Sequence, residues 1–464
     1  MNTLKKFRTP QIEHLHSGKV RDSFRINSTT RMIVVTDRIS CFDKVLKTPI
    51  PHKGAILNAM ASFWFHKTQN IIPNHLISLP DPNIALVKEA KPIAVEVIVR
   101  GYLTGSMWRY YEQGKRTFSG ITVGDGLKKN QKFPKPILTP TTKEESDREI
   151  TPEEIVSSGL VSREIYEQME KAALELFKLG SEYLETKDIL LVDTKYEFGL
   201  VDGKLILIDE MHTPDSSRFW SLQDYKKYPE NADSIDKEYV RLWLLQNKKG
   251  NEIPSELPES VVLETQRRYL EIFEKVTGQV PSFIYSSENI LERMRDNLAK
   301  ANLIKKGYVA IFMGSAGDKD HVDTIIQHLK PFDLKVDCRV VSAHKNGEDI
   351  VAMIEDYNAS IEPGVAIAVA GRSNGLGGAL AYNLTIPVIN CPPFKDKVDL
   401  MVNLNSSLMM PSSTPAMTVV DPELAALAAV RCLQLPELKN LLNDKIQEGK
   451  MKLRQDDLKM RGRA

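Results

Sequence analysis

Three charged residues, Lys195, Glu197 and Asp209, lie on two segments that otherwise have the pattern of half-buried strands. A buried charge is unfavourable unless it is paired or binds a ligand, so these side chains indicate a functional site. The segments are joined by Asp202-Gly203, a sequence typical of a hairpin turn. Two carboxylates on one face of such a hairpin could hold a hard cation between their oxygens.

The length of the hairpin loop decides which face each charge occupies. A two-residue turn pairs Val201 with Lys204 and puts the two carboxylates on opposite faces. A three-residue loop with Gly203 in the left-handed conformation pairs Leu200 with Lys204 and brings all three charges to one face. The polar loop at residues 214–218 also favours a site, so we predict the three-residue loop. A surface ladder of salt bridges is the alternative.

A second pattern that could bind an anion lies near the amino terminus. Lys19 and Arg21 follow Gly18 at alternate positions. On a strand both cations point to one face, while the glycine lets a phosphate approach the backbone. A charged, exposed hairpin is the alternative. The sequence has no G-x-x-x-x-G-K-[ST] segment, which excludes a P-loop.

The second half of the chain alternates short apolar and helical segments from Tyr308 onward, which predicts a doubly wound parallel sheet. Ligands of such sheets bind beyond the carboxyl ends of the strands. The loops predicted there are Gly314–Asp318, Ser342–Lys345, Gly371–Gly375 and Asn390–Pro393. His344 is a candidate general acid/base, because imidazole has an ordinary pKa of about 6.5. A structural histidine is the alternative.

The two patterns predict two domains within the 464 residues. We expect an α+β domain over residues 1–298, a linker over 299–307 and an α/β domain over 308–464 with a charged carboxyl-terminal tail. Apolar residues at three and four spacing predict helices over 162–184, 259–277 and 288–303.

Composition excludes several classes of partner. The net charge is +1, from 62 Lys plus Arg and 61 Asp plus Glu, so no global field attracts nucleic acid or anionic lipid. No segment approaches the roughly 20 apolar residues of a membrane span, and the amino terminus lacks the apolar run of a secretory signal. The four cysteines are scattered, without a C-x-x-C spacing, which predicts a reducing, cytoplasmic location.

Five motifs between residues 10 and 290 resemble the phosphoribosylaminoimidazole-succinocarboxamide synthases of purine biosynthesis. They are Gly18–Asp22, Thr36–Asp43, His52–Gly54, Glu96–Ser106 and the hairpin around Asp202-Gly203. The resemblance implies an ATP-grasp-like fold and the ligation of L-aspartate to carboxyaminoimidazole ribonucleotide with hydrolysis of ATP. ATP would phosphorylate the carboxylate, and the amine of aspartate would attack the resulting acyl phosphate.

The same resemblance implies roles for individual residues. Gly18, Lys19 and Arg21 would bind the phosphates of ATP, and Glu197 and Asp209 would hold Mg²⁺. Lys195 would be catalytic and face the transferring phosphoryl group. The nucleotide substrate would be bound by Arg100, Ser106 and Arg218. Secondary candidates, with a structural turn network as the alternative, are Asp37, Arg38 and Asp43.

Residues 308–433 resemble the animal-type aminoimidazole ribonucleotide carboxylases, which use CO₂ directly and without ATP. The resemblance implies that His344 is the general acid/base and that Lys345 neutralises the carboxylate. Cys391 is expected to pack rather than to act as a nucleophile. Substrate-binding candidates are Ser315, Asp318, Ser342, Gly371, Arg372, Ser373 and Asn374. This family forms octamers, so we expect a homo-octamer joined through this domain.

Two positions depart from the carboxylase pattern, since Gly317 stands in place of a serine and Met409 in place of an arginine. Three alternatives stay open, of which only the scaffold is motivated by these two departures. The second half could be a mutase that acts on the carbamate isomer, although Lys345 in place of an arginine argues against it. It could be an inactive oligomerisation scaffold. The whole chain could instead be a small-molecule kinase fused to a flavodoxin-like module.

Overall fold

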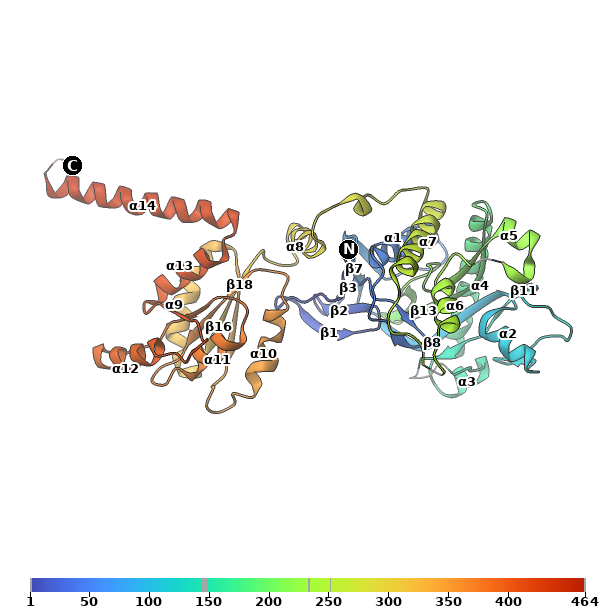
Figure 1. Cartoon of the computed structure of the whole chain (residues 1–464), viewed down its shortest axis with the longest axis horizontal. Helices are drawn as coiled ribbons and strands as arrows, with labels where there is room; N and C mark the ends of the chain where they lie inside the picture. The colour runs from blue at the N-terminus through green and yellow to red at the C-terminus, as the bar shows by residue number, and fades with distance from the viewer. Residues whose placement is uncertain (1, 144–147, 233, 251, 463–464) are drawn as a thin grey trace. The chain divides into compact units, whose positions relative to one another are not determined.

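The computed structural model describes residues 2–143, 148–232, 234–250 and 252–462. The chain divides into two compact units. The first comprises residues 13–294 and a short stretch that ends at Lys6. The second comprises residues 7–12 and the chain from Arg295 onward. A short amino-terminal segment therefore belongs to the unit formed by the second half of the chain (Figure 1).

The first unit contains two larger antiparallel sheets. One has the order β1-β2-β3-β7-β6, formed by Glu13–Ser17, Arg21–Arg25, Thr30–Val35, Ile84–Lys88 and Leu76–Asp81. The other has the order β11-β8-β13-β14, formed by Lys132–Leu138, Lys91–Tyr102, Ile189–Val201 and Lys204–Ile208. Here β12 (Thr141–Thr142) pairs with β8, and β15 (Ser217–Ser221) pairs with β13. Two small pairs are β4 (Ser40–Cys41) with β5 (Lys44–Val45) and β9 (Thr117–Phe118) with β10 (Ile121–Thr122).

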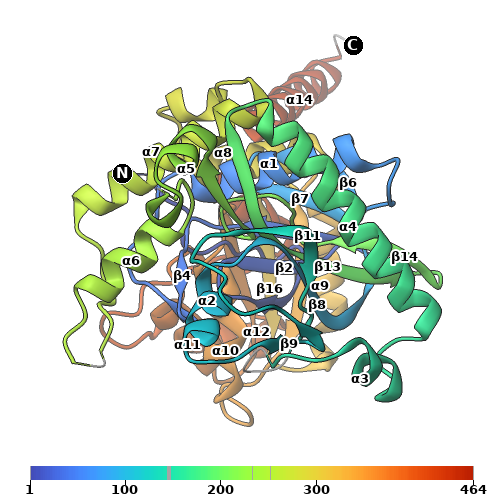
Figure 2. The same ribbon diagram turned by 90° about the vertical axis from the view of Figure 1, so that its right-hand side faces the viewer.

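Helices cover the second of these sheets and complete the main core of the unit. Helix α4 (Arg163–Glu185) packs on β13 and β8, and α1 (Lys53–Thr68) packs on α7 (Glu259–Thr277) (Figure 2). Helix α4 begins after Ser162, whose side chain accepts the Ile165 N–H, because an N-terminal N–H has no partner within the helix. The shorter helices are α2 (Gly105–Glu112), α3 (Pro152–Ser157), α5 (Leu222–Lys227), α6 (Glu238–Gln246), η1 (Pro229–Asn231) and η2 (Ser282–Tyr285). The predicted helices over 162–184 and 259–277 are confirmed.

The second unit is a five-stranded parallel sheet in the order β17-β16-β18-β19-β20. The strands are Lys335–Val340, Tyr308–Met313, Gly364–Val369, Val388–Asn390 and Met417–Thr418. In order of sequence this is 2-1-3-4-5, the flavodoxin-like doubly wound arrangement, so the predicted fold class is confirmed. The chain reverses its direction of winding between β16 and β18, where ligands of such folds bind.

Helices lie on both faces of this sheet (Figure 1), and alternate residues of the central strand β16 belong to different hydrophobic clusters. Val309 and Ile311 face α9 (Lys319–Leu329) and α13 (Pro422–Leu433). Tyr308 and Phe312 face α10 (Asp349–Asn358) and α11 (Gly375–Asn383). The remaining helices of this unit are α12 (Lys397–Leu408), α14 (Pro436–Met460), η3 (Ala316–Asp318) and η4 (Lys330–Phe332), while α8 (Ile290–Lys300) contains the division between the units. The sequence did not predict α12 or α13, whereas the charged tail is the expected exposed helix, with only Leu438 buried.

Hydrogen bonds fix the segment of residues 7–12 within the second unit. The Thr9 hydroxyl donates to Glu362 Oε1 over 2.6 Å, and the Ile361 N–H donates to the Arg8 carbonyl over 3.1 Å. Gln11 Nε2 donates to the carbonyl of Lys305 over 2.7 Å. This segment thus connects the loop before β18 with the loop before β16.

The start of β18 requires glycine, because a Cβ on Gly364 would lie 2.0 Å from Cζ of the fully buried Tyr308. We expect Gly364→Ala to destabilise the second unit by about 1–3 kcal/mol. Gly449→Ala, in the exposed helix α14 with nothing within 4 Å of the new Cβ, should stabilise slightly or have no effect.

The four tryptophans, Trp64, Trp108, Trp220 and Trp243, all lie in the first unit, which separates the two unfolding signals. In urea, the Gly364→Ala variant should lose far-UV circular dichroism earlier than the parent, with the tryptophan fluorescence transition unchanged. Equal urea midpoints of the circular dichroism transition for the two glycine variants would contradict this expectation. They would show that the Tyr308 ring can move aside without a loss of stability.

Candidate active sites

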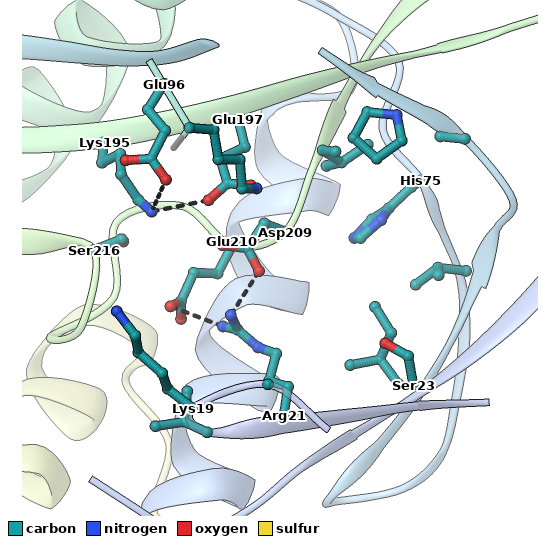
Figure 3. Close-up of a pocket in the computed structure, with 18 of the residues that line it drawn as sticks. Lys19, Arg21, Ser23, His75, Glu96, Lys195, Glu197, Asp209, Glu210 and Ser216 are labelled. Atoms are coloured by element: carbon teal, nitrogen blue, oxygen red, sulfur yellow. Dashed lines mark hydrogen bonds and ion pairs between the residues drawn. The ribbon is translucent and has the colours of Figure 1, made fainter. Parts of the chain in front are cut away.

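A cavity of about 640 Å³ lies between the two larger sheets of the first unit (Figure 3). Strands β2, β3 and β7 line one side, and β8, β13 and β14 line the other. Its apolar lining includes Ile33, Val87, Pro92, Ile93 and Ile208. Its charged lining includes Lys19, Arg21, Glu96, Lys143, Lys195, Glu197, Asp209 and Glu210. An apolar wall beside a few convergent polar groups is the usual composition of a small-molecule site.

The hairpin that supplies part of this lining has the two-residue turn, so the predicted three-residue loop is wrong. Val201 pairs with Lys204, and Glu197 pairs with Ile208. Both turn residues, Asp202 and Gly203, have positive φ angles of 50° and 75°, as a type I′ turn requires. This turn matches the twist of the flanking strands, which explains why the hairpin adopts it.

Glu197 and Asp209 nevertheless line the same cavity (Figure 3). Strand β14 ends at Ile208, and Asp209 has a left-handed backbone with a φ of 64°. The alternation of a regular strand therefore does not extend to Asp209. Aspartate tolerates this conformation better than most residues, which a strand pattern alone does not indicate.

Lys195 lies at the centre of the charges on the second sheet. Its Nζ donates to Glu96 Oε1 and to Glu197 Oε1, each over 2.8 Å (Figure 3). Lys143 also forms an ion pair with Glu197. Burial would raise the pKa of Glu197, but Lys195 and Lys143 outweigh it and lower that pKa to about 2. No individual role is predicted for Glu96 or Lys143 from the sequence, because neither is close to the hairpin along the chain.

Arg21 reaches the cavity from β2 and contacts two carboxylates. Its Nη1 lies 2.5 Å from Asp209 Oδ1, and its Nη2 lies 2.7 Å from Glu210 Oε1. Burial raises the pKa of Asp209 to about 7; the attraction of Arg21 opposes this shift, while repulsion from Glu197 and Glu210 adds to it. Lys19 is more exposed and pairs with Asp43 over 2.6 Å.

Asp37 and Arg38, two of the secondary candidates, form hydrogen bonds with backbone groups of neighbouring segments. Asp37 is fully buried and accepts the N–H groups of Leu4 and Gly54 over 2.8 and 2.9 Å. Arg38 donates to the carbonyls of Gly18 and Lys19, each over 3.1 Å, and so fixes the loop that carries the predicted ATP-binding residues.

Asp215 is a further carboxylate of the cavity that sequence analysis did not assign. It lies 2.8 Å from Nζ of the fully buried Lys53 and accepts a hydrogen bond from the Tyr269 hydroxyl over 2.8 Å. Burial opposes its ionisation, but Lys237 and Lys53 hold its pKa well below the usual range. These partners come from α1, α7 and the start of α6, so only the tertiary fold brings them together.

The predicted substrate residues gather beside a second, smaller pocket of the first unit. Arg100 and Ser106 line this pocket, together with Thr139, Thr141 and Glu149. Arg100 Nη1 lies 3.5 Å from Asp193 Oδ2, and Arg218 also pairs with Asp193. The bare Cα of Gly105 makes room for the Arg218 guanidinium, since a Cβ there would lie 2.6 Å from Nη2. Asp193 was not among the predicted residues.

In the second unit, His344 lies where the loops after β17 and β18 meet. Its side chain is exposed, and its Nε2 lies 3.5 Å from the Ser373 hydroxyl. Lys345 beside it is also exposed. After β16, the Ser315 hydroxyl accepts the Gly317 N–H over 3.1 Å, and Asp318 has a pKa that burial raises.

Cys391 is fully buried at the end of β19, with its Sγ 3.2 Å from Nε2 of His321. Burial raises the pKa of this thiol to about 12, which agrees with a packing role. In the part of the chain that the structure describes, no group of three or more His, Cys, Asp or Glu side chains is arranged to hold a metal ion. No helix within those residues is long and apolar enough to cross a membrane.

The buried pair of Lys53 and Asp215 should matter more for stability than any exposed pair. We expect Lys53→Met to lower the free energy of unfolding of the first unit by about 3–5 kcal/mol, because it leaves a buried carboxylate without its close partner. Lys47→Met is the control: Lys47 lies 3.4 Å from Glu256, with both side chains about 70% exposed, and its loss should change stability by about 1 kcal/mol or less. Urea unfolding followed by tryptophan fluorescence measures both, and similar losses would contradict the expectation.

Comparison with known proteins gives two family matches, one in each half of the chain. The SAICAR synthetase family model matches residues 14–257, and the AIR carboxylase family model matches residues 308–456. SAICAR denotes the succinocarboxamide ribonucleotide and AIR denotes aminoimidazole ribonucleotide.

Individual relatives match the first part of the chain. The phosphoribosylaminoimidazole-succinocarboxamide synthase of Azobacteroides pseudotrichonymphae is 44% identical over 295 residues, which cover 61% of this chain and 90% of that protein. The same-named protein of Bacteroides fragilis is 42% identical over 303 residues, or 63% of this chain and 96% of that protein. The solved SAICAR synthase of Saccharomyces cerevisiae, complexed with SAICAR, is 35% identical, with a TM-score of 0.55, and the match covers 60% of this chain and all of that one.

The match to the synthetase family extends over more than half of the chain and over nearly the full length of these relatives. The parallel sheet of the second unit lies within the region that matches the carboxylase family. The chain therefore belongs to the SAICAR synthetase family, carries an AIR carboxylase domain behind the synthetase domain, and is a bifunctional enzyme of purine biosynthesis.

Proposed function

We propose that the chain performs two consecutive reactions on one ribonucleotide. The second unit attaches CO₂ to aminoimidazole ribonucleotide, and the first unit joins the resulting carboxyaminoimidazole ribonucleotide to L-aspartate with hydrolysis of ATP. The observation that carries this proposal is the cavity of the first unit, where an apolar wall adjoins the charges of Arg21, Lys195, Glu197 and Asp209. We assign ligation to the domain predicted at residues 1–298, apart from the segment 7–12 and the residues from Arg295 that belong to the second unit, and carboxylation to residues 308–464. We place the protein in the cytoplasm, since its four cysteines are free.

In the first unit, the apolar wall suits the base of ATP, and Gly18, Lys19 and Arg21 suit its phosphates. The oxygen ligands of Glu197 and Asp209 are of the type that Mg²⁺ prefers, and Mg²⁺ commonly takes one or two carboxylates together with substrate phosphates. Bound there, the ion would neutralise charge on the phosphates. The fit rests on the shared cavity and on the donor set.

The ligation itself needs positioning and charge neutralisation. A carboxylate oxygen of the ribonucleotide attacks the γ-phosphorus of ATP, and ADP leaves. The amine of aspartate then attacks the acyl carbon, loses a proton, and inorganic phosphate leaves. Lys195 faces the transferring phosphoryl group from the cavity wall. The ribonucleotide binds at Arg100, Ser106 and Arg218, whose cluster adjoins a separate pocket.

In the second unit, the carboxylase reaction forms a bond between the ring carbon and CO₂ and then removes the proton from that carbon. His344 is the general acid/base, because its exposed imidazole lies beside the Ser373 hydroxyl of the loop after β18. Lys345 neutralises the new carboxylate, and Ser315 and Asp318 bind the ribose phosphate region and the ribose hydroxyls. Ser342 is a further substrate-binding residue. The loop of residues Gly371, Arg372, Ser373 and Asn374 surrounds CO₂ and the base.

Separate variants test the two halves of this proposal in one chain. We expect His344→Asn to abolish the carboxylation of aminoimidazole ribonucleotide and to leave ligation of supplied carboxyaminoimidazole ribonucleotide unchanged. Glu197→Gln should leave carboxylation unchanged and reduce ligation by about a hundredfold or more. It removes a carboxylate that we propose holds Mg²⁺, and so weakens the stabilisation of charge on the transferring phosphoryl group. The measurement is a coupled assay with bicarbonate, ATP, Mg²⁺ and aspartate, in which each component is omitted in turn.

The same assay separates the alternatives for the second unit. Activity with the carbamate isomer but not with bicarbonate and the unmodified ribonucleotide would identify a mutase. The absence of both activities, with ligation intact, would identify a scaffold, an alternative to which Gly317 and Met409 point. ATP turnover without aspartate would favour the kinase alternative.

The homo-octamer is a further part of the proposal and is supported by helix α12. Its Val398, Met401, Val402 and Leu408 are each more than half exposed, as is the adjoining Met409. Apolar patches of this kind commonly mark interaction surfaces.

We expect the full chain to sediment as an oligomer and Met401→Glu to reduce its molar mass, because a charge would then be buried at the interface. Val351→Glu, which changes a 66% exposed valine on α10, is the control and should leave the molar mass unchanged. Sedimentation velocity gives the answer, and a monomeric parent chain would contradict the octamer.

A further inference from the structure

Helix α12 directs polar side chains into the second unit as well as apolar ones outward. Asn403 and Ser407 are only 2% and 1% exposed. Buried polar groups are stable only where hydrogen bonds replace their contacts with water. The partners of these side chains therefore show what the inner face of α12 holds in place.

Asn403 connects the loops that follow two neighbouring strands. Its Oδ1 accepts the Arg372 N–H over 2.5 Å, in the loop after β18. Its Nδ2 donates to the Pro393 carbonyl over 2.6 Å, in the loop after β19. An asparagine side chain offers one acceptor and one donor group at the same planar end. The two contacts use both, whereas an aspartate would lack the donor and a leucine would lack both.

Two neighbours of Asn403 hold the other end of the same loop. The Ser406 hydroxyl accepts the Asn374 N–H over 2.5 Å, and the Ser407 hydroxyl accepts from Asn374 Nδ2 over 3.0 Å. Asn374 Oδ1 in turn accepts the Gly377 N–H over 2.9 Å and caps helix α11. The loop from Gly371 to Asn374 is therefore fixed through its backbone at both ends.

The loop needs this support because of its own conformation. Arg372 has a φ of 58°, in the left-handed region that side chains other than glycine rarely adopt. The hydrogen bond from the Arg372 N–H to Asn403 favours this conformation. The next residue, Ser373, is the one whose hydroxyl lies 3.5 Å from His344 Nε2.

We propose that Asn403 is a positioning residue of the carboxylase site. Its side chain bonds to the loop backbone and holds the Gly371–Asn374 loop in the conformation that faces His344. This inference rests on the proposed function of that loop and of His344. It assigns a role to a helix that the sequence analysis did not predict.

The first test compares Asn403→Ala with Asn405→Ala, a matched change at an exposed asparagine of the same helix. We expect Asn403→Ala to lower kcat for carboxylation by about ten- to a hundredfold, the size of effect that a displacement of about 1 Å produces. KM for aminoimidazole ribonucleotide should change by less than about threefold, because Ser315 and Asp318 on another loop bind its phosphate end. The ligation rate of the same chain and the calorimetric stoichiometry of ribonucleotide binding should not change.

A partly unfolded variant would lose binding stoichiometry in proportion to kcat, and that result would overturn the proposal. An equal loss in Asn405→Ala, or a kcat within twofold of the parent, would overturn it as well. A loss confined to KM would indicate a binding role instead and would also count against it.

The second test does not depend on carboxylase activity. Hydrogen–deuterium exchange by mass spectrometry should show the peptide that contains residues 371–374 exchanging at least about tenfold faster in Asn403→Ala, because the Arg372 amide loses its acceptor. The peptide of β18 (Gly364–Val369) should be unchanged. If the parent chain and His344→Asn both lack carboxylase activity, the proposed function of the second unit is wrong. The exchange measurement then decides by itself whether Asn403 holds the loop. Unchanged exchange would overturn that role.

Discussion

The cavity of the first unit depends on the pairing of opposite charges away from bulk water. Glu96 and Glu197 lie directly opposite each other on β8 and β13, an arrangement in which two like charges repel. The ammonium group of Lys195 forms ion pairs with both carboxylates and so compensates their mutual repulsion. Arg21, which comes from β2 in the other sheet, likewise forms ion pairs with both Asp209 and Glu210. Under the proposed function, ATP and Mg²⁺ would exchange partners with charges that are already in place, which avoids the larger penalty of burying unpaired ions.

Local backbone conformation decides which charges take part in this pairing. The chain leaves β14 at Ile208 through Asp209, and His212 shortly after it also has a positive φ of 49°. His212 is fully buried, and its Nε2 lies 2.5 Å from the Tyr196 hydroxyl of β13. This contact secures the segment that returns to the sheet as β15. That return brings Arg218 opposite Asp193, so one irregular segment connects the larger cavity with the cluster around the smaller pocket.

These features explain how far the sequence predicts the molecule. Periodicity predicted α4 and α7, because their buried faces follow a regular repeat. Short apolar runs predicted the first four strands of the second unit, and β20 was not predicted. The position of His344 in a loop after a parallel strand also agrees with the prediction, since such a loop is recognisable from sequence alone. The hairpin register was predicted wrongly because an Asp-Gly pair fits more than one loop length. The prediction assumed that Asp209 continues the alternation of the strand, whereas its left-handed backbone brings it to the cavity with the two-residue turn. Glu96, Asp193 and Asp215 were missed, because their partners are distant in sequence and meet only through strand pairing and helix packing. Helix α12 was missed because its outer face is apolar, so it lacks the usual polar stripe of an exposed helix.

The proposed site of the second unit consists of backbone and small side chains rather than charge pairs, and its glycines show the difference. The segment Gly375-Leu376-Gly377 superficially resembles a dinucleotide-binding motif, but a Cβ on Gly375 would lie 2.8 Å from His344 Cε1. A Cβ on Gly377 would lie 2.0 Å from the Asn390 Oδ1 atom. These glycines are thus required so that α11 can approach an imidazole from one strand end and an amide from another. In such a site the charge of a loop residue matters less than the size of its side chain and the position of its backbone N–H group. The residues that fix the loops therefore determine the geometry around His344 as much as those that line it.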